Sequence, residues 1–170
     1  MSRWLIVGVA LTGVGLLWLW RYGQRPYRYK NVQSRDLGRF FDTLLKRGHQ
    51  GGLLILEANE RTGEHRFLQF AKYMRPDGRA GLEFGFPLAP WSRPYYELLR
   101  RKLDAGGVRY ELQDTGRQDT VQFLVVNLGR DLATAQRVAE IAVEAVFGRP
   151  DSAFQASYEN VSPRDEQIGR

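Results

Sequence analysis

Residues 4–20 are the feature that most constrains this chain, because they form a run of 17 residues without a single charge. As an α-helix, this run would be about 25 Å long, close to the roughly 30 Å hydrocarbon core of a bilayer. Trp4 at one end and Trp18 and Trp20 at the other are typical of the aromatic belts at membrane interfaces. The run therefore predicts a transmembrane helix over 4–20.

Two other interpretations of this run are a cleaved signal peptide and a buried core helix. A signal peptide normally has a shorter apolar region that ends in small residues, whereas this run ends in Trp18-Leu19-Trp20. A core helix would have to bury three tryptophans around its circumference. The uncleaved anchor is the preferred interpretation.

Basic residues follow the run more densely than they precede it. Arg21, Arg25, Arg28 and Lys30 come after it, and Arg3 lies before it. The positive-inside rule then places the rest of the chain in the cytoplasm of a bacterium, on a single-pass protein of the inner membrane. The same four residues are candidates for contact with anionic lipid. Insertion in the opposite direction is the alternative.

Gly8, Thr12 and Gly15 would share one face of such a helix. Small residues in a stripe let a second helix approach closely. These three residues are candidates for packing against a helix of a membrane protein complex.

The formal charge of +6 belongs almost entirely to the N-terminal region. Residues 1–30 carry five basic residues and no acid, and the remaining 140 residues carry 20 basic and 19 acidic side chains. A nearly neutral domain argues against a nucleic-acid partner. The absence of cysteine excludes disulfides, thiolate metal sites and thiol catalysis.

The rest of the chain divides into a basic and polar linker (21–33), one domain (34–148) and a polar tail (149–170) that is expected to be disordered. Apolar periodicity and capping signals predict three helices, over about 34–47, 92–105 and 131–147. Strands are expected over 53–57, 66–74, 79–86, 108–113 and 120–128. The predicted fold is α+β: a transmembrane helix, then an α-βββ-α-ββ-α domain with an antiparallel sheet.

Pro76-Asp77-Gly78 sets the register of the central hairpin. A three-residue loop with proline first and glycine last pairs residues whose numbers sum to 154. That register sets Phe70 opposite Phe84 on the core face. On the other face it sets Tyr73 opposite Gly81, where the ring can cover bare backbone.

Two surfaces are candidates for binding a protein. Trp91, Tyr95 and Tyr96 cluster beside prolines at the start of a helix, as aromatic anchors of interfaces do. The alternative is that Trp91 and Tyr95 close the end of the core. The second candidate is the half-polar sheet face with Gln69, Tyr73 and Glu83, whose alternative is an ordinary solvent-facing surface.

No motif indicates an enzyme. His49 and His65 lack neighbouring ligands at metal-binding spacing, and neither a phosphate-binding glycine loop nor a nucleophile elbow is present. Glu57 and Glu83 could pair as acid and base on neighbouring strands, but a carboxylate on a solvated face is usually only solvated. We therefore expect no catalytic residue, no cofactor and no metal.

The stretches FLQFAKYM (67–74), GLEFGF (81–86) and VRYELQDTGRQDTVQFLVVNLG (108–129) resemble the class I type III secretion chaperones of the Tir-chaperone-like superfamily. The resemblance implies an α+β fold that binds protein partners on sheet and helix surfaces, often as a dimer, without enzymatic activity. The chain departs from that family in being nearly neutral in its domain and in carrying the apolar N-terminal run.

The expected function is therefore a membrane-anchored protein-binding module that assists assembly, stabilisation or chaperoning of a membrane protein complex, as a possible homodimer. The alternative is a small accessory subunit that joins such a complex mainly through its transmembrane helix.

Overall fold

The computed structural model describes residues 27–58, 66–74, 77–114, 122–149 and 153–162. These residues form seven strands, three α-helices and one short 3-10 helix. In chain order the elements are β1 (Tyr27–Val32), η1 (Ser34–Asp36), α2 (Leu37–Arg47), β2 (Gly48–Ala58), β3 (Phe67–Met74), β4 (Ala80–Leu88), α3 (Arg93–Ala105), β5 (Glu111–Asp114), β6 (Gln122–Gly129), α4 (Leu132–Phe147) and β7 (Phe154–Val161).

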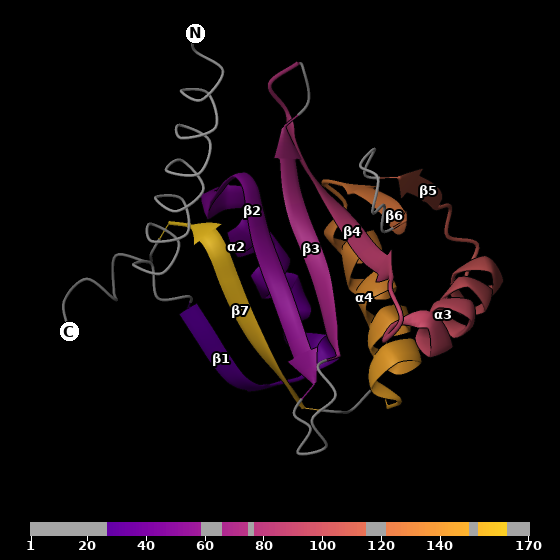
Figure 1. Ribbon diagram of the computed structural model, residues 1–170. Coiled ribbons are helices and arrows are strands. Elements are labelled where there is room, and N and C mark those ends of the chain that lie inside the picture. The colour runs from indigo at the N-terminus through magenta and orange to yellow at the C-terminus, as the bar shows by residue number, and fades with distance from the viewer. Residues whose placement is uncertain (1–26, 59–65, 75–76, 115–121, 150–152, 163–170) are drawn as a thin grey trace, which may run out of the picture.

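The seven strands make one sheet in the order β1-β7-β2-β3-β4-β6-β5, and every neighbouring pair is antiparallel. Strands β2, β3 and β4 are consecutive in sequence and adjacent in the sheet. Strand β7, which comes last along the chain, lies between β1 and β2 (Figure 1). The two ends of the described chain are therefore joined inside the sheet.

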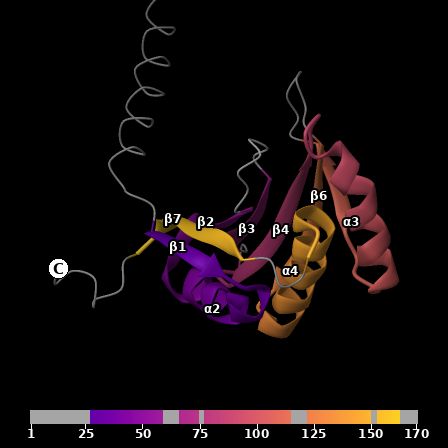
Figure 2. The same ribbon diagram turned by 90° about the horizontal axis from the view of Figure 1, so that it is seen from below.

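The helices cover one face of this sheet. Helix α2 packs against β2 and β7, helix α4 against β3 and β6, and α3 packs mainly against α4. Figure 2 shows α2 and α4 on the same side of the sheet. The core lies between the two layers and includes Phe41, Phe70 and Phe84, which are fully buried. No described helix covers the opposite face.

The central hairpin has the predicted register. Phe70 pairs with Phe84 and Tyr73 with Gly81, and Gly78 in the connecting turn has a positive φ of 77°, which glycine adopts without steric strain. Phe70 and Phe84 are in ring contact, with centroids 5.1 Å apart. The register of the β3–β4 hairpin thus places Phe70 and Phe84 on the core face and Tyr73 and Gly81 on the other face.

Helix α4 begins and ends at the predicted residues. The carboxylate of Asp131 accepts hydrogen bonds from the backbone N–H groups of Ala133 and Thr134. Gly148 ends the helix in the left-handed conformation, where a residue with a Cβ would be strained. Helix α2, in contrast, begins at Leu37, because residues 34–36 form the 3-10 turn η1 instead of its first turn.

The segments that flank the domain are ordered strands, contrary to the prediction. Part of the expected linker is strand β1, and part of the expected disordered tail is strand β7, with Phe154 and Ala156 fully buried. Both segments are too polar to predict a core strand, and they become ordered because they pair with each other and with β2. The sheet therefore has seven strands where five were expected.

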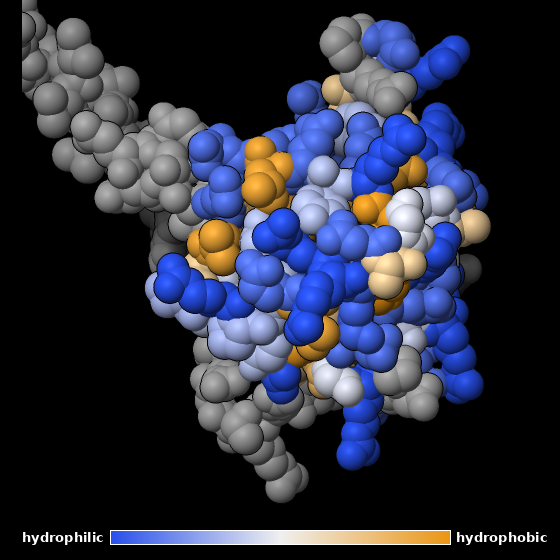
Figure 3. Space-filling view, turned by 90° about the vertical axis from the view of Figure 1, so that its right-hand side faces the viewer, coloured by the Kyte–Doolittle hydropathy of each residue, from blue (hydrophilic) through white to orange (hydrophobic). Residues whose placement is uncertain are grey.

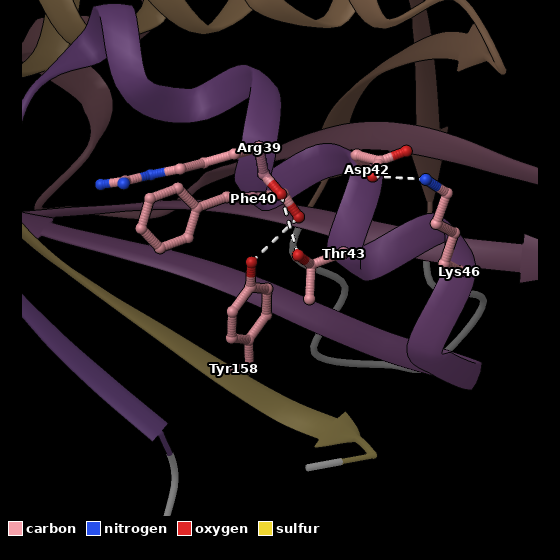
Figure 4. Close-up of polar contacts among 6 residues, drawn as sticks. All are labelled: Arg39, Phe40, Asp42, Thr43, Lys46 and Tyr158. Atoms are coloured by element: carbon pink, nitrogen blue, oxygen red, sulfur yellow. Dashed lines mark hydrogen bonds and ion pairs between the residues drawn. The ribbon is translucent and has the colours of Figure 1, made fainter. Parts of the chain in front are cut away.

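Strand β7 is also tied to the helical layer. The hydroxyl of Tyr158 donates a hydrogen bond of 3.0 Å to the backbone carbonyl of Phe40 in α2 (Figure 4). Its ring stacks on the Phe40 ring at 5.8 Å and meets the edge of Tyr29 of β1 at 6.0 Å. The C-terminal strand thus connects β1, β2 and α2.

The predicted transmembrane helix is also corrected. In the ranges that the structure describes, none of the helices is both long and apolar enough to cross a bilayer. The run 4–20, with Gly8, Thr12 and Gly15, lies outside those ranges, as do Arg21 and Arg25. The fold class with a membrane helix, and the single-pass inner-membrane location built on it, are therefore not supported.

Candidate functional site

The sheet face turned away from the helices is the main surface that the described elements leave uncovered. Along β2, β3, β4 and β6, fully buried residues such as Leu54, Phe70 and Phe84 alternate with partly exposed ones. Because successive side chains of a strand point to opposite faces, the partly exposed set shares the other face. We call it the open face: Leu53, Ile55, Glu57, Phe67, Gln69, Ala71, Tyr73, Glu83, Gly85, Phe123, Val125 and Asn127.

The centre of the open face is a row of residues paired across four strands. Ile55 pairs with Gln69, Gln69 with Gly85, and Gly85 with Val125. The row combines two β-branched apolar side chains, one amide and one position without a side chain. A Cβ at Gly85 would meet nothing closer than Phe123 Cδ1 at 3.8 Å, so the surface is hollowed over β4.

The neighbouring row contains the charged residue Glu83. Leu53 pairs with Ala71, Ala71 with Glu83, and Glu83 with Asn127. Burial raises the pKa of the Glu83 carboxyl above its ordinary value, because the surrounding protein disfavours the ionised form. Among the residues described, no hydrogen bond or ion pair reaches this carboxylate.

Tyr73 lies across β4 at one end of this row. Its ring occupies the space in which a Gly81 side chain would lie. Its hydroxyl donates a hydrogen bond of 2.9 Å to Oδ1 of Asn127 on β6. That oxygen also accepts from the backbone N–H of Gly129 at 3.0 Å. The Tyr73 ring thus covers the backbone of Gly81, as the hairpin register predicts.

The aromatic cluster predicted at residues 91–96 belongs mostly to the core. Tyr96 is 3% exposed, so its side chain is not available to a partner, and that part of the prediction is wrong. The Trp91 ring contacts Phe67 at 5.0 Å and Phe86 at 5.8 Å. The Arg66 guanidinium lies over the Tyr95 ring at 5.3 Å. Trp91 and Tyr95 close the end of the core beside the open face.

Burial also raises the pKa of the Tyr96 hydroxyl, and that oxygen has no hydrogen-bond partner among the described residues. The hydroxyl is therefore a structural feature of the helix packing, not a group presented to solvent.

The other predicted residues are dispersed. Arg28 and Lys30 are exposed on the edge strand β1, where charged side chains discourage further strand pairing. Glu57 lies on the open face, where it pairs with Phe67, but β3 separates its strand from that of Glu83. The described sheet therefore gives no support to a pairing of the two carboxylates as acid and base.

The histidines do not form a site in the described structure. His49 Nε2 lies 3.0 Å from the exposed hydroxyl of Ser162, and His65 lies outside the described residues. The described ranges contain no group of three or more His, Cys, Asp or Glu residues placed to hold a metal ion.

Lys72 is an unexpected residue on the core side of the sheet. It is 8% exposed, and its ammonium donates hydrogen bonds to the carbonyls of Leu45 and Gly48 at the end of α2. Burial, followed by the charge of Arg130, lowers the pKa of this lysine. Because a cation stabilises the C-terminal end of a helix dipole, the residue has a structural role.

The side of the molecule that carries α3 differs from the open face. Figure 3 shows hydrophobic residues there as separate spots among hydrophilic ones. The exposed large hydrophobic residues of the described ranges, Met74 and Leu112, lie at a hairpin end and on the edge strand β5. Scattered apolar residues of this kind are normal on a protein surface.

Sequence reasoning found Gln69, Tyr73 and Glu83 but missed Leu53, Ile55, Val125 and Asn127. Their signal was present as a short apolar run in β2 and as alternation in β6. In β6 the apolar residues on both faces left the inward set open to error: Phe123 and Val125 are expected to face the core, but the structure buries Leu124, Val126 and Leu128 instead. The alternate residues become a surface only when the strand order places β2 and β6 on either side of the hairpin.

No protein-family model matches this chain, and neither a curated protein nor a solved structure matches it.

Proposed function

We propose that this chain is a non-enzymatic protein-binding module that binds its partner on the open face and assists assembly, stabilisation or chaperoning of a protein complex. The observation that carries the proposal is the composition of that uncovered face. Ile55 and Val125 lie at its centre, Gln69 separates them, and Gly85 leaves a hollow in the same row. Apolar residues with a few polar groups and an uneven relief are typical of protein interfaces.

The element order gives secondary support. The succession helix, three strands, helix, two strands, helix that resembles the Tir-chaperone-like superfamily is present from α2 to α4, between the additional strands β1 and β7. That resemblance implies binding of proteins on a sheet surface. The proposal adopts the binding role and leaves the identity of the partner to experiment.

A pull-down with one substitution on each face tests the proposal. The full chain carrying Ile55→Lys places a charge at the centre of the open face, where the neighbours Gln69 and Ser157 are polar and tolerate it. Leu112→Lys is the matched control, because Leu112 is 48% exposed and pairs with the buried Leu124 on the helix side of the sheet. Both variants are first checked for an unchanged melting temperature.

We expect wild type and Leu112→Lys to retain the same stoichiometric partner and Ile55→Lys to lose it. Retention of the partner by Ile55→Lys, or its loss only with Leu112→Lys, would show that the open face is not the binding surface.

A further inference from the structure

The carboxylate of Glu83 is a charged group near the centre of the open face, which the described elements leave uncovered. Its cross-strand neighbours are Ala71 and Asn127, neither of which carries a charge. Within the described residues, the carboxylate receives no hydrogen bond and no ion pair, although burial already raises its pKa. Glu83 is thus desolvated without compensation from the surrounding side chains.

A partly buried carboxylate without a partner is unfavourable, because it has lost water and gained no donor. Covering the open face would remove its remaining water. A bound protein must then either leave the charge unpaired or supply a cation, and a charge-assisted hydrogen bond in a desolvated interface is the favourable solution.

The surroundings of Glu83 leave space for a long basic side chain. On one side along β4, Gly85 has no side chain, and a Cβ there would find its nearest neighbour at 3.8 Å. On the other side, the Tyr73 ring covers Gly81 and is fixed by its hydrogen bond to Asn127.

An arginine suits this arrangement better than a lysine. Its planar guanidinium can bond both carboxylate oxygens and also stack on an aromatic ring. Its aliphatic stem can pack on apolar surface, which the hollow over Gly85 and the adjacent Val125 provide.

We propose that the partner is a protein segment that inserts an arginine between Tyr73 and Gly85 and pairs it with the carboxylate of Glu83. This inference rests on the proposed function, since it names the anchor by which the open face recognises its partner. Apolar residues around the arginine contact Leu53, Ile55 and Val125.

The test is a selection from a random peptide library displayed on phage, with the full chain as bait. Three baits are compared: wild type, Glu83→Lys and Glu97→Lys. Glu97 is a matched control, because it is an exposed glutamate on α3, away from the open face. The selected peptides are then synthesised with arginine or glutamine at the enriched position, and their affinities are measured for all three baits and for Ile55→Lys.

We expect wild type and Glu97→Lys to enrich peptides with an arginine in an apolar context, and Glu83→Lys to enrich an acidic residue instead. Replacing the arginine of a selected peptide with glutamine should weaken binding about tenfold to wild type and hardly at all to Glu83→Lys, since the pair is only partly desolvated.

The outcomes separate this inference from the proposed function. If the selected peptides lose binding to Ile55→Lys and yet show no preference for arginine, that result would contradict an arginine bound to Glu83. It would still support the open face as a binding surface. A selection without any peptide sensitive to Ile55→Lys overturns both. If the wild-type chain self-associates and Glu83→Lys abolishes this self-association, the partner is not a different protein, because a second copy of the chain then supplies the cation.

Discussion

The ring of Tyr73 on β3 fills the space above Gly81 on β4, so that a side chain at residue 81 would clash with it. The same ring reaches across β4 to Asn127 on β6 through its hydroxyl, at 2.9 Å. One side chain thus connects three strands on the open face. The absence of a side chain at residue 81 is a condition of that contact.

Gly81→Ala is expected to displace the Tyr73 ring and break its hydrogen bond to Asn127. The free energy of unfolding should fall by about 1–2 kcal/mol, the usual cost of overpacking combined with a lost hydrogen bond. Gly85→Ala is the matched control, since its Cβ has room, and it should change stability by less than about 0.5 kcal/mol. Urea unfolding of both variants measures the difference, and equal costs at the two glycines would contradict the account.

Tyr158→Phe should lower the free energy of unfolding by about 1 kcal/mol, because it removes a buried hydrogen bond between β7 and α2. Thr43→Val is a suitable control. The Thr43 hydroxyl donates to the Arg39 carbonyl within the exposed side of α2 (Figure 4), so its loss should cost only a few tenths of a kcal/mol. If Thr43→Val lowers the free energy of unfolding as much as Tyr158→Phe does, the hydrogen bond between β7 and α2 contributes no more to stability than an exposed one.

Ala156→Asp tests whether the C-terminal strand belongs to the core. Ala156 is fully buried and pairs with Tyr29 on one side and Leu56 on the other. An unpaired charge there should cost about 3–5 kcal/mol, whereas Gln155→Lys on the opposite face, where the cross-strand neighbour is Glu57, should stay within about 0.5 kcal/mol. Thermal unfolding followed by circular dichroism compares the two, and a tolerated Ala156→Asp would mean that β7 is dispensable.

Glu83→Gln should stabilise the protein at neutral pH. Because burial raises the folded-state pKa of Glu83, the stabilising contribution of this group is fully present below its unfolded-state pKa. It is lost as pH rises through the folded-state value. Wild type should therefore become less stable than Glu83→Gln as pH increases across that window, and the two should converge at lower pH. Unfolding by urea at a series of pH values measures this difference, and parallel curves would show that Glu83 titrates normally.

The parts of the fold that the sequence predicted well are specified by local residues. The turn at Asp77-Gly78 accompanies the predicted hairpin register, and Asp131 and Gly148 determine the ends of α4. Each signal acts over a few residues, through a turn or a cap whose chemistry is independent of the rest of the chain.

The missed strands depend on contacts that are distant in sequence. Strand β7 contains Gln155, Ser157 and Glu159, and its buried positions are partly filled by Ala156. Such a composition is typical of a polar tail as much as of a strand. Strand β7 is ordered because it pairs with β1 and β2, which lie far earlier in the chain. A pattern within residues 154–161 cannot predict this pairing.

The candidate site shows the same division. Tyr73 and Glu83 could be placed on one face from the hairpin alone, whereas Ile55 and Val125 join them only through the strand order. Aromatic residues beside prolines are typical both of interfaces and of the ends of a core. The sequence therefore could not show to which of these Trp91, Tyr95 and Tyr96 belong. Their ring contacts, not their sequence, decide between the two.

Site-specific photo-crosslinking tests the central claim most directly. A photoreactive phenylalanine derivative is introduced in the full chain at Gln69, at the centre of the open face, or at Arg101, on the exposed side of α3. The account predicts a crosslinked partner protein with the probe at residue 69 and none with the probe at residue 101. A partner captured only at residue 101, or none at residue 69 while the partner still co-purifies, would contradict binding on the open face.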